Sequence, residues 1–161
     1  VEYVEPSAKE IHGFSEEDLY KLSNGLYFED QFEEISDDFL NADILIGHNV
    51  NFDIKFITHE LEFCEINYKP KNTFCTMNYY KNICKCSNGK GGIKNPKLEE
   101  VVNFLGLNST IIKTKANELF DGSGNYHDAR FDTAATYLVV TEGIRKGLIP
   151  KGYFTKMVKN N

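Results

Sequence analysis

The sequence contains no tryptophan, and it has only four cysteines, four prolines and two methionines. No apolar run approaches the roughly 20 residues that a membrane-spanning helix requires, so we expect no membrane partner. The first residues show neither the basic segment nor the long apolar segment of a secretion signal. Because the chain starts at Val1 rather than at methionine, we expect the natural N-terminus to lie upstream.

The composition otherwise resembles that of a soluble globular protein. Hydrophobic residues make up 41% and charged residues 26% of the 161 residues, which is the size of one domain. A chain of this length can bury a substantial core. The 12 phenylalanines and nine tyrosines predict that this core is rich in aromatic side chains.

The four cysteines allow two interpretations. Cys84 and Cys86, together with the more distant Cys64 and Cys75, could form part of a zinc site. Structural zinc sites more often use pairs of cysteines separated by two residues. The pattern therefore favours reduced thiols in a cytosolic protein, and we expect a cytoplasmic location.

Charge is distributed unevenly along the chain, whose overall net charge is −6. Residues 1–43 hold 13 acidic and 2 basic residues, whereas residues 44–161 hold 11 acidic and 16 basic residues. Five lysines and no acid lie between Lys81 and Lys97, in a glycine-rich segment that we expect to be a mobile loop. Such a loop could neutralise phosphates, but charge alone favours a solvated lysine loop.

Strand and helix patterns alternate along the chain, which predicts an α/β domain with helices packed on a sheet. The expected strands are residues 1–5, 43–47 and 73–75. Ser15 is expected to cap a helix, and Phe52 and Phe56 are expected to turn inward from another. The remaining helices are expected at residues 30–41, 51–63, 77–84, 97–105 and 129–146. Residues 1–146 would form the domain, and 147–161 would be a basic tail, either a linker or a loosely docked end.

A first candidate site lies at Gly47–Asp53, where a buried strand is expected to pass into a helix. Ligands of open α/β sheets bind at the carboxyl ends of strands, and Asp53 would lie close to that end. Its carboxylate could hold a hard divalent cation, while Asn49 orients neighbouring groups and Phe52 fixes the turn. The junction alone favours a plainer role, in which Asp53 only complements the helix dipole.

A second candidate site lies at His127–Thr136. His127 precedes the expected helix and Asp132 lies about one turn inside it, so the imidazole and the carboxylate can face one point. Histidine titrates near neutral pH and can accept a proton from water. Taken alone, this pattern favours a surface or capping histidine.

Together these segments resemble the histidine-containing, DEDD-type superfamily of 3′–5′ exonucleases, which includes the epsilon proofreading subunit of bacterial DNA polymerase III and ribonuclease T. The second motif of that family, His-Asn-x-x-Phe-Asp, reads His48-Asn49-Val50-Asn51-Phe52-Asp53 here. The third motif, a histidine followed by an aspartate five positions later, reads His127 and Asp132. Three further stretches follow the family pattern in the same order: Ile11–Ser15, Phe74–Met77, and Lys97-Leu98 with Gly106-Leu107.

The resemblance implies a ribonuclease H-like exonuclease fold, with a mixed central sheet flanked by helices. It also implies that two Mg²⁺ or Mn²⁺ ions assist the removal of mononucleotides from a nucleic-acid 3′ end. Asp53 and Asp132 would bind the metal ions, and His127 would be the general base. The residues that would support the site or contact the substrate are His12, Phe14, Asn49 and Phe52.

The sequence departs from the family in one respect. The first family motif, Asp-x-Glu on the first strand, would lie upstream of Ile11, and this sequence does not contain it. We therefore expect the first strands, with their two carboxylates, to lie outside this sequence. A chain that truly began at Val1 would have severely reduced metal affinity and activity.

Three functions compatible with the sequence remain as alternatives. The first is a 3′–5′ exonuclease that acts on single-stranded DNA or RNA, alone, with a DNA polymerase or as a homodimer. The second is a noncatalytic nucleic-acid-binding relative that lacks a complete metal site. The third is an unrelated α/β module that binds a protein through its acidic first 43 residues.

Overall fold

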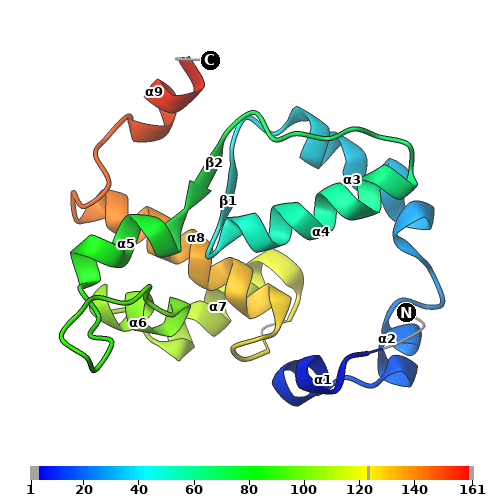
Figure 1. Cartoon of the computed structure of the whole chain (residues 1–161), viewed down its shortest axis with the longest axis horizontal. Helices are drawn as coiled ribbons and strands as arrows, with labels where there is room; N and C mark the ends of the chain where they lie inside the picture. The colour runs from blue at the N-terminus through cyan, green and yellow to red at the C-terminus, as the bar shows by residue number, and fades with distance from the viewer. Residues whose placement is uncertain (1–3, 123, 160–161) are drawn as a thin grey trace. The chain divides into compact units, whose positions relative to one another are not determined.

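The structure is a computed structural model that describes residues 4–122 and 124–159, without the side chains of Ile11 and His12. Within these residues the chain forms helices and two short strands (Figure 1). In chain order they are α1 (Pro6–His12), α2 (Glu16–Leu22), α3 (Phe28–Asn41), β1 (Leu45–Gly47), α4 (Val50–Phe63), β2 (Thr73–Cys75), α5 (Thr76–Cys84), α6 (Leu98–Phe104), α7 (Ser109–Phe120), α8 (Ala129–Arg145) and α9 (Tyr153–Lys159).

The chain divides into two compact units. The first unit comprises the chain up to Ala42 together with Phe56–Lys69, and the second comprises Asp43–Lys55 together with the chain from Pro70 onward. Helix α4 therefore begins in the second unit and ends in the first.

Local capping signals set the helices of the first unit. Ser15 caps α2 as predicted, because its hydroxyl accepts a hydrogen bond from the backbone N–H of Asp18 while the Asp18 carboxylate accepts one from the backbone N–H of Ser15. Pro6 occupies the first turn of α1, a position that suits its fixed φ and missing N–H. The strand expected at residues 1–5 is wrong for its described part, since Val4 and Glu5 lead into α1 instead, and residues 1–3 lie outside the described residues.

The interior of the first unit is small. Leu61 of α4 is fully buried, and Tyr68 is nearly so, with its hydroxyl donating a hydrogen bond to the backbone oxygen of Phe39 at 3.2 Å. No residue of α2 or α3 is buried among those that the structure describes. The predicted inward position of Phe56 is wrong, because its side chain is 53% exposed.

The second unit contains the sheet. Strands β1 and β2 are parallel, with Leu45, Ile46 and Gly47 opposite Thr73, Phe74 and Cys75. The α/β prediction is thus confirmed in a mostly helical form, because the described residues give a sheet of two strands. The larger mixed sheet of a ribonuclease H-like fold stays a prediction.

Helix α8 forms the centre of the second unit, and α5, α6 and α7 all pack against it. The core contains Phe131 and Val139 of α8, Tyr80 of α5 and Val101 of α6, all fully or almost fully buried. The Tyr80 hydroxyl is satisfied in this apolar environment because it donates to the backbone oxygen of Val139 at 3.1 Å.

The segment after Gly147 extends this core. Ile149 is fully buried, and the hydroxyl of Tyr79 donates to the backbone oxygen of Leu148 at 2.8 Å. Helix α9 stacks Phe154 edge-to-face on Phe74 of β2, with ring centroids 5.0 Å apart. Gly147 and Pro150 interrupt the sequence pattern here, and for that reason α9 was not predicted.

The lysine-rich segment between α5 and α6 forms a hairpin rather than an irregular loop. Ser87 and Ile93 face each other in an antiparallel bridge, and the backbone N–H of Lys94 donates to the oxygen of Cys86 at 2.9 Å. The predicted mobile loop is therefore held by its own hydrogen bonds.

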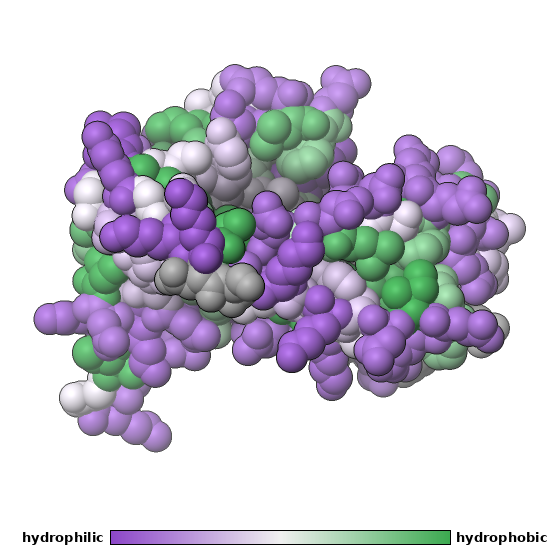
Figure 2. Space-filling view, turned by 90° about the horizontal axis from the view of Figure 1, so that it is seen from above, coloured by the Kyte–Doolittle hydropathy of each residue, from purple (hydrophilic) through white to green (hydrophobic). Residues whose placement is uncertain are grey.

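The apolar character of the helices and of the surface also bears on function. Within the described residues, no helix combines the length and apolar character needed to cross a membrane. The face shown in Figure 2 is largely hydrophilic, with hydrophobic residues gathered into separate patches.

Candidate active site

The turn between β1 and α4 carries the first group of predicted site residues. Asn49 has a φ of 73°, in the left-handed region that asparagine tolerates better than most residues, and it lies in the turn between the end of β1 at Gly47 and the start of α4 at Val50. The helix starts at Val50, one residue before the predicted range of 51–63. Val50 is almost completely buried, which anchors the turn.

His48 ties this turn to two other segments of the second unit. Its Nδ1 lies 3.0 Å from the hydroxyl of Thr76, and its Nε2 lies 3.0 Å from the backbone oxygen of Pro96. Because a carbonyl can only accept, Nε2 carries the proton. The Thr76 hydroxyl also lies 3.3 Å from the backbone oxygen of Gly47, so its one proton can go to that oxygen or to Nδ1. Burial lowers the pKa of His48, which favours a neutral ring.

Asp53 lies in the first turn of α4, as predicted. Neighbouring protein atoms partly desolvate its carboxylate and raise its pKa, and a hydrogen bond from its own backbone N–H offsets part of this effect. Phe52 stands beside it but is 60% exposed, so the prediction that Phe52 turns inward is wrong. In an α-helix, Val50 and Ile54 share a face from which residue 52 points away, so this turn buries Val50 instead.

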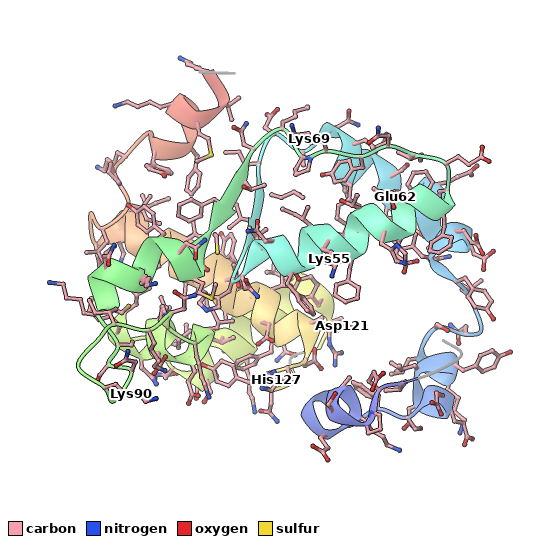
Figure 3. All side chains as sticks on the ribbon, in the orientation of Figure 1. Lys55, Glu62, Lys69, Lys90, Asp121 and His127 are labelled. Carbon is pink, nitrogen blue, oxygen red and sulfur yellow. The ribbon has the colours of Figure 1, made fainter. Side chains whose placement is uncertain are left out.

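The second group lies at the start of α8. Asp128 caps this helix by accepting a hydrogen bond from the backbone N–H of Arg130 at 3.0 Å, and it also forms an ion pair with the Arg130 guanidinium. His127 precedes the cap with a φ of 74°, which is uncommon for a residue with a side chain. Figure 3 shows His127 on the loop that leads into α8.

Asp132 is the most constrained carboxylate of the candidate site. Its Oδ2 accepts a hydrogen bond from the backbone N–H of His127 at 3.2 Å, so the turn holds the two residues together. Its Oδ1 is buried without a hydrogen-bond partner among the described residues. Desolvation raises the pKa of Asp132, against the lowering effects of the His127 backbone N–H and of the His127 charge.

Two residues near these groups were not anticipated. Tyr126 packs edge-to-face on Phe131 with ring centroids 4.7 Å apart, and the charge of Asp132 contributes to its raised pKa, after desolvation and Glu99. Thr76 is fully buried and holds His48. Tyr126 could have been identified from the sequence, because it is an aromatic residue directly before the histidine of the third motif. No local sequence pattern identifies Thr76.

The structure joins some of the predicted site residues and leaves others apart. His127 and Asp132 are in direct contact, and both belong to the second unit together with Asn49 and Asp53. Among the described residues, no group of three or more histidine, cysteine, aspartate or glutamate side chains is placed to hold a metal ion. Phe14 belongs to the first unit, and the His12 side chain lies outside the described part of the chain.

Comparison with known proteins gives a partial similarity. Over 66 residues, 41% of the chain and 7% of the relative, the sequence is 36% identical to the protein named 3′-5′ exonuclease DinG of Staphylococcus saprophyticus. Over 60 residues, 37% of the chain and 7% of the relative, it is 37% identical to the protein of the same name from Staphylococcus aureus. The matches therefore cover a small part of each relative's length. No family model and no solved structure matches the chain.

Proposed function

We propose that this chain belongs to a metal-dependent 3′–5′ exonuclease of the histidine-containing DEDD type. The observation that carries the proposal is Asp132, whose carboxylate is desolvated, held by the His127 turn, and left with one buried oxygen without a partner among the described residues. A buried carboxylate oxygen without a partner is costly unless a ligand completes it. The partial identity to proteins named 3′-5′ exonuclease supports the same conclusion.

The carboxylates present fit hard divalent cations. Mg²⁺ and Mn²⁺ prefer oxygen ligands, and Asp53 and Asp132 offer them from two rigid helices. Desolvation penalises both negative charges, and a cation would relieve this penalty. In the resembled family, an Asp-x-Glu motif supplies two further carboxylates to the metal site. When bound, two such ions would stabilise the charge that develops on a phosphodiester during hydrolysis.

The side chains of the site would have separate roles in the reaction. His127, on its constrained turn, would take a proton from the attacking water at one imidazole nitrogen. Asn49 would hold the β1–α4 turn that positions Asp53. Phe52, beside Asp53 on the same turn of α4, would support the site. In the resembled family the residues equivalent to Phe14 and His12 contact the substrate, and a ring such as Phe14 would stack on a base.

The substrate we propose is the 3′ end of single-stranded DNA or RNA, and the product is a nucleoside monophosphate. Stacking on aromatic rings tolerates any base, because every base presents a π face. A free strand end also reaches the site without the energy needed to open a duplex.

The test is degradation of oligonucleotides that carry a label at the 5′ end or at the 3′ end, with Mn²⁺ or Mg²⁺. We expect a 5′-labelled strand to yield a ladder that shortens stepwise, and a 3′-labelled strand to release its label as a mononucleotide at once. Chelation of the metal should stop both reactions. Internal cleavage, or shortening from the 5′ end, would contradict the proposal.

The second candidate function is noncatalytic binding of nucleic acid. It is favoured by one observation, that the described residues place no group of three or more metal-binding side chains together. This function predicts that oligonucleotides bind with equal affinity in Mn²⁺ and in chelator, and that no mononucleotide appears. The same labelled strands distinguish the two functions.

A further inference from the structure

Hydrogen bonds fix the backbone conformation at the tip of the lysine-rich hairpin. The Asn88 side-chain oxygen accepts hydrogen bonds from the backbone N–H groups of Lys90 at 2.8 Å and Gly92 at 3.0 Å. Gly89 and Gly91 have φ values of 74° and 81°, which strain other residues, and a Cβ at either position would meet nothing within 4 Å. The tip is therefore ordered and open to an approaching ligand.

The lysines of the hairpin fall into two kinds. Lys94 is already engaged, because its ammonium donates to both carboxylate oxygens of Glu100, at 2.7 and 2.9 Å. Lys85 and Lys90 are exposed, and neither forms an ion pair with any residue that the structure describes. No acid lies between Lys81 and Lys97, so these two charges have no compensating partner in their own segment.

The hairpin is also attached to the candidate active site. The backbone oxygen of the fully buried Pro96, where the hairpin returns, lies 3.0 Å from Nε2 of His48. His48 belongs to the turn that leads into Asp53, and Lys97 follows Pro96 directly. Figure 3 shows Lys90 at the far end of the hairpin, well apart from His127. The hairpin therefore connects the exposed ammonium groups of Lys85 and Lys90 to the candidate site through hydrogen-bonded backbone.

We propose that the hairpin of residues 85–97 is a second contact for the phosphodiester backbone of a single strand whose 3′ end lies at Asp53 and Asp132. This inference rests on the proposed function, which places the 3′ end there. Lys85 and Lys90 contact backbone phosphates upstream of the terminal nucleotide. Such contacts carry no base preference, and they strengthen binding only for strands long enough to reach the hairpin.

The test is fluorescence anisotropy with labelled 12-nucleotide and two-nucleotide single strands, without catalytic metal, for the whole chain and its Lys85→Gln/Lys90→Gln variant. Loss of two phosphate contacts should reduce the slope of log K against log salt by about 1.4, since each contact on a single strand contributes about 0.7. Affinity for the 12-nucleotide strand should fall about tenfold at low salt. Affinity for the two-nucleotide strand should not change.

Two matched variants control for net charge. Lys151→Gln/Lys156→Gln removes the same charge from exposed lysines of the C-terminal segment, and we expect it to leave the salt slope unchanged. Lys85→Arg/Lys90→Arg keeps the charge and should restore wild-type binding. Circular dichroism would verify that all variants fold alike.

Three outcomes overturn the inference: equal losses in both glutamine variants, no loss in the hairpin variant, or no binding of the 12-nucleotide strand by the wild-type chain. Failure of the proposed function is distinguishable from these. A chain that binds the long strand through Lys85 and Lys90 but releases no mononucleotide with Mn²⁺ would retain the hairpin contact and lose the exonuclease activity.

Discussion

The two compact units differ in charge and in interior. The first unit holds 15 acidic and 3 basic residues, a net charge of −12, whereas the second holds 9 acidic and 15 basic residues, a net charge of +6. Both hydrophobic clusters of the described residues belong to the second unit. Among the described residues of the first unit, only Leu61 and Tyr68 are buried.

This difference indicates which unit would bind the proposed nucleic-acid substrate. A polyanion is attracted to the basic unit and repelled by the acidic one, so an overall net charge of −6 does not argue against a nucleic-acid substrate. The basic unit also supplies the rigid core on which catalytic geometry depends. Matched substitutions in the two units therefore test whether they differ in function and in stability.

The largest effect is expected for Asp132→Asn, with Asp38→Asn of the acidic unit as its match. We expect the first to reduce mononucleotide release to background, because the amide loses the negative charge that attracts a metal ion, and the second to leave the rate unchanged. The assay is release of a 3′ label with Mn²⁺. Equal rates in both variants would remove Asp132 from the site.

Asp132→Asn should also be more stable than the wild type at neutral pH. Because the pKa of Asp132 is raised in the folded chain, the folded state binds the proton more tightly than the unfolded state. The free energy of unfolding therefore falls as pH rises from the unfolded pKa through the folded one. Thermal melting should give a higher Tm for Asp132→Asn at pH 7, and the difference should disappear in acid, below both pKa values.

His127→Ala should lower the cleavage rate by about 10²–10⁴-fold, the usual contribution of a general base. His59→Ala, on the part of α4 that belongs to the acidic unit, should leave the rate within twofold of wild type, or about 0.4 kcal/mol. Single-turnover kinetics with saturating oligonucleotide separates this effect from weaker binding. An unchanged rate in His127→Ala would assign the proton transfer to another group.

Phe131→Ala and Phe63→Ala compare the two interiors directly. Phe131 is 1% exposed in the basic unit, so its truncation should lower the free energy of unfolding by about 3–5 kcal/mol. Phe63 is 69% exposed in the acidic unit, and its truncation should change stability by no more than about 0.5 kcal/mol. Urea denaturation measures both, and similar losses would mean that the acidic unit has a core of its own.

Gly143→Ala, for which we expect the smallest loss of stability among the core substitutions, tests how tightly the basic unit is packed. A Cβ on Gly143 of α8 would meet the hydroxyl oxygen of Tyr80, so Gly143→Ala should destabilise the chain by about 1–3 kcal/mol through overpacking. Tyr80→Phe removes that oxygen, and in its background the alanine should be less destabilising. Additive losses in the double variant, measured by urea denaturation, would show that the two residues do not compete for space.

Periodic and capped elements could be predicted from the sequence. The long helix α8, the Ser15 cap of α2 and the position of strand β1 follow from local pattern alone. The burial predicted for that strand is wrong, because Ile46 is 41% exposed. Helix α7 was missed because its start, Ser109-Thr110-Ile111-Ile112, combines residues of weak helix propensity, although Asn108 caps it. The partners of Phe74 on α9 depend on contacts across about 80 residues of sequence, which no local pattern contains.

The candidate site divides in the same way. The placement of Asp53 and Asp132 in first helical turns was predictable from their spacing to the preceding motifs. The buried Thr76–His48–Pro96 connection was not, because it joins three segments through side-chain and backbone atoms distant in sequence. The exposure of Phe52 also escaped prediction, since a phenylalanine in a motif resembles a core residue until the helix face is known.

The central claim is tested most directly by Mn²⁺ binding, measured by isothermal titration calorimetry on protein that carries the Asp-x-Glu motif ahead of this chain. The wild type is compared with Asp53→Asn and Asp132→Asn, and Asp38→Asn is the control. Either substitution at the site is expected to remove the same binding event, whereas the control keeps it. Mn²⁺ that binds all four proteins equally, or that is lost only with Asp38, would contradict the assignment of the site to the basic unit.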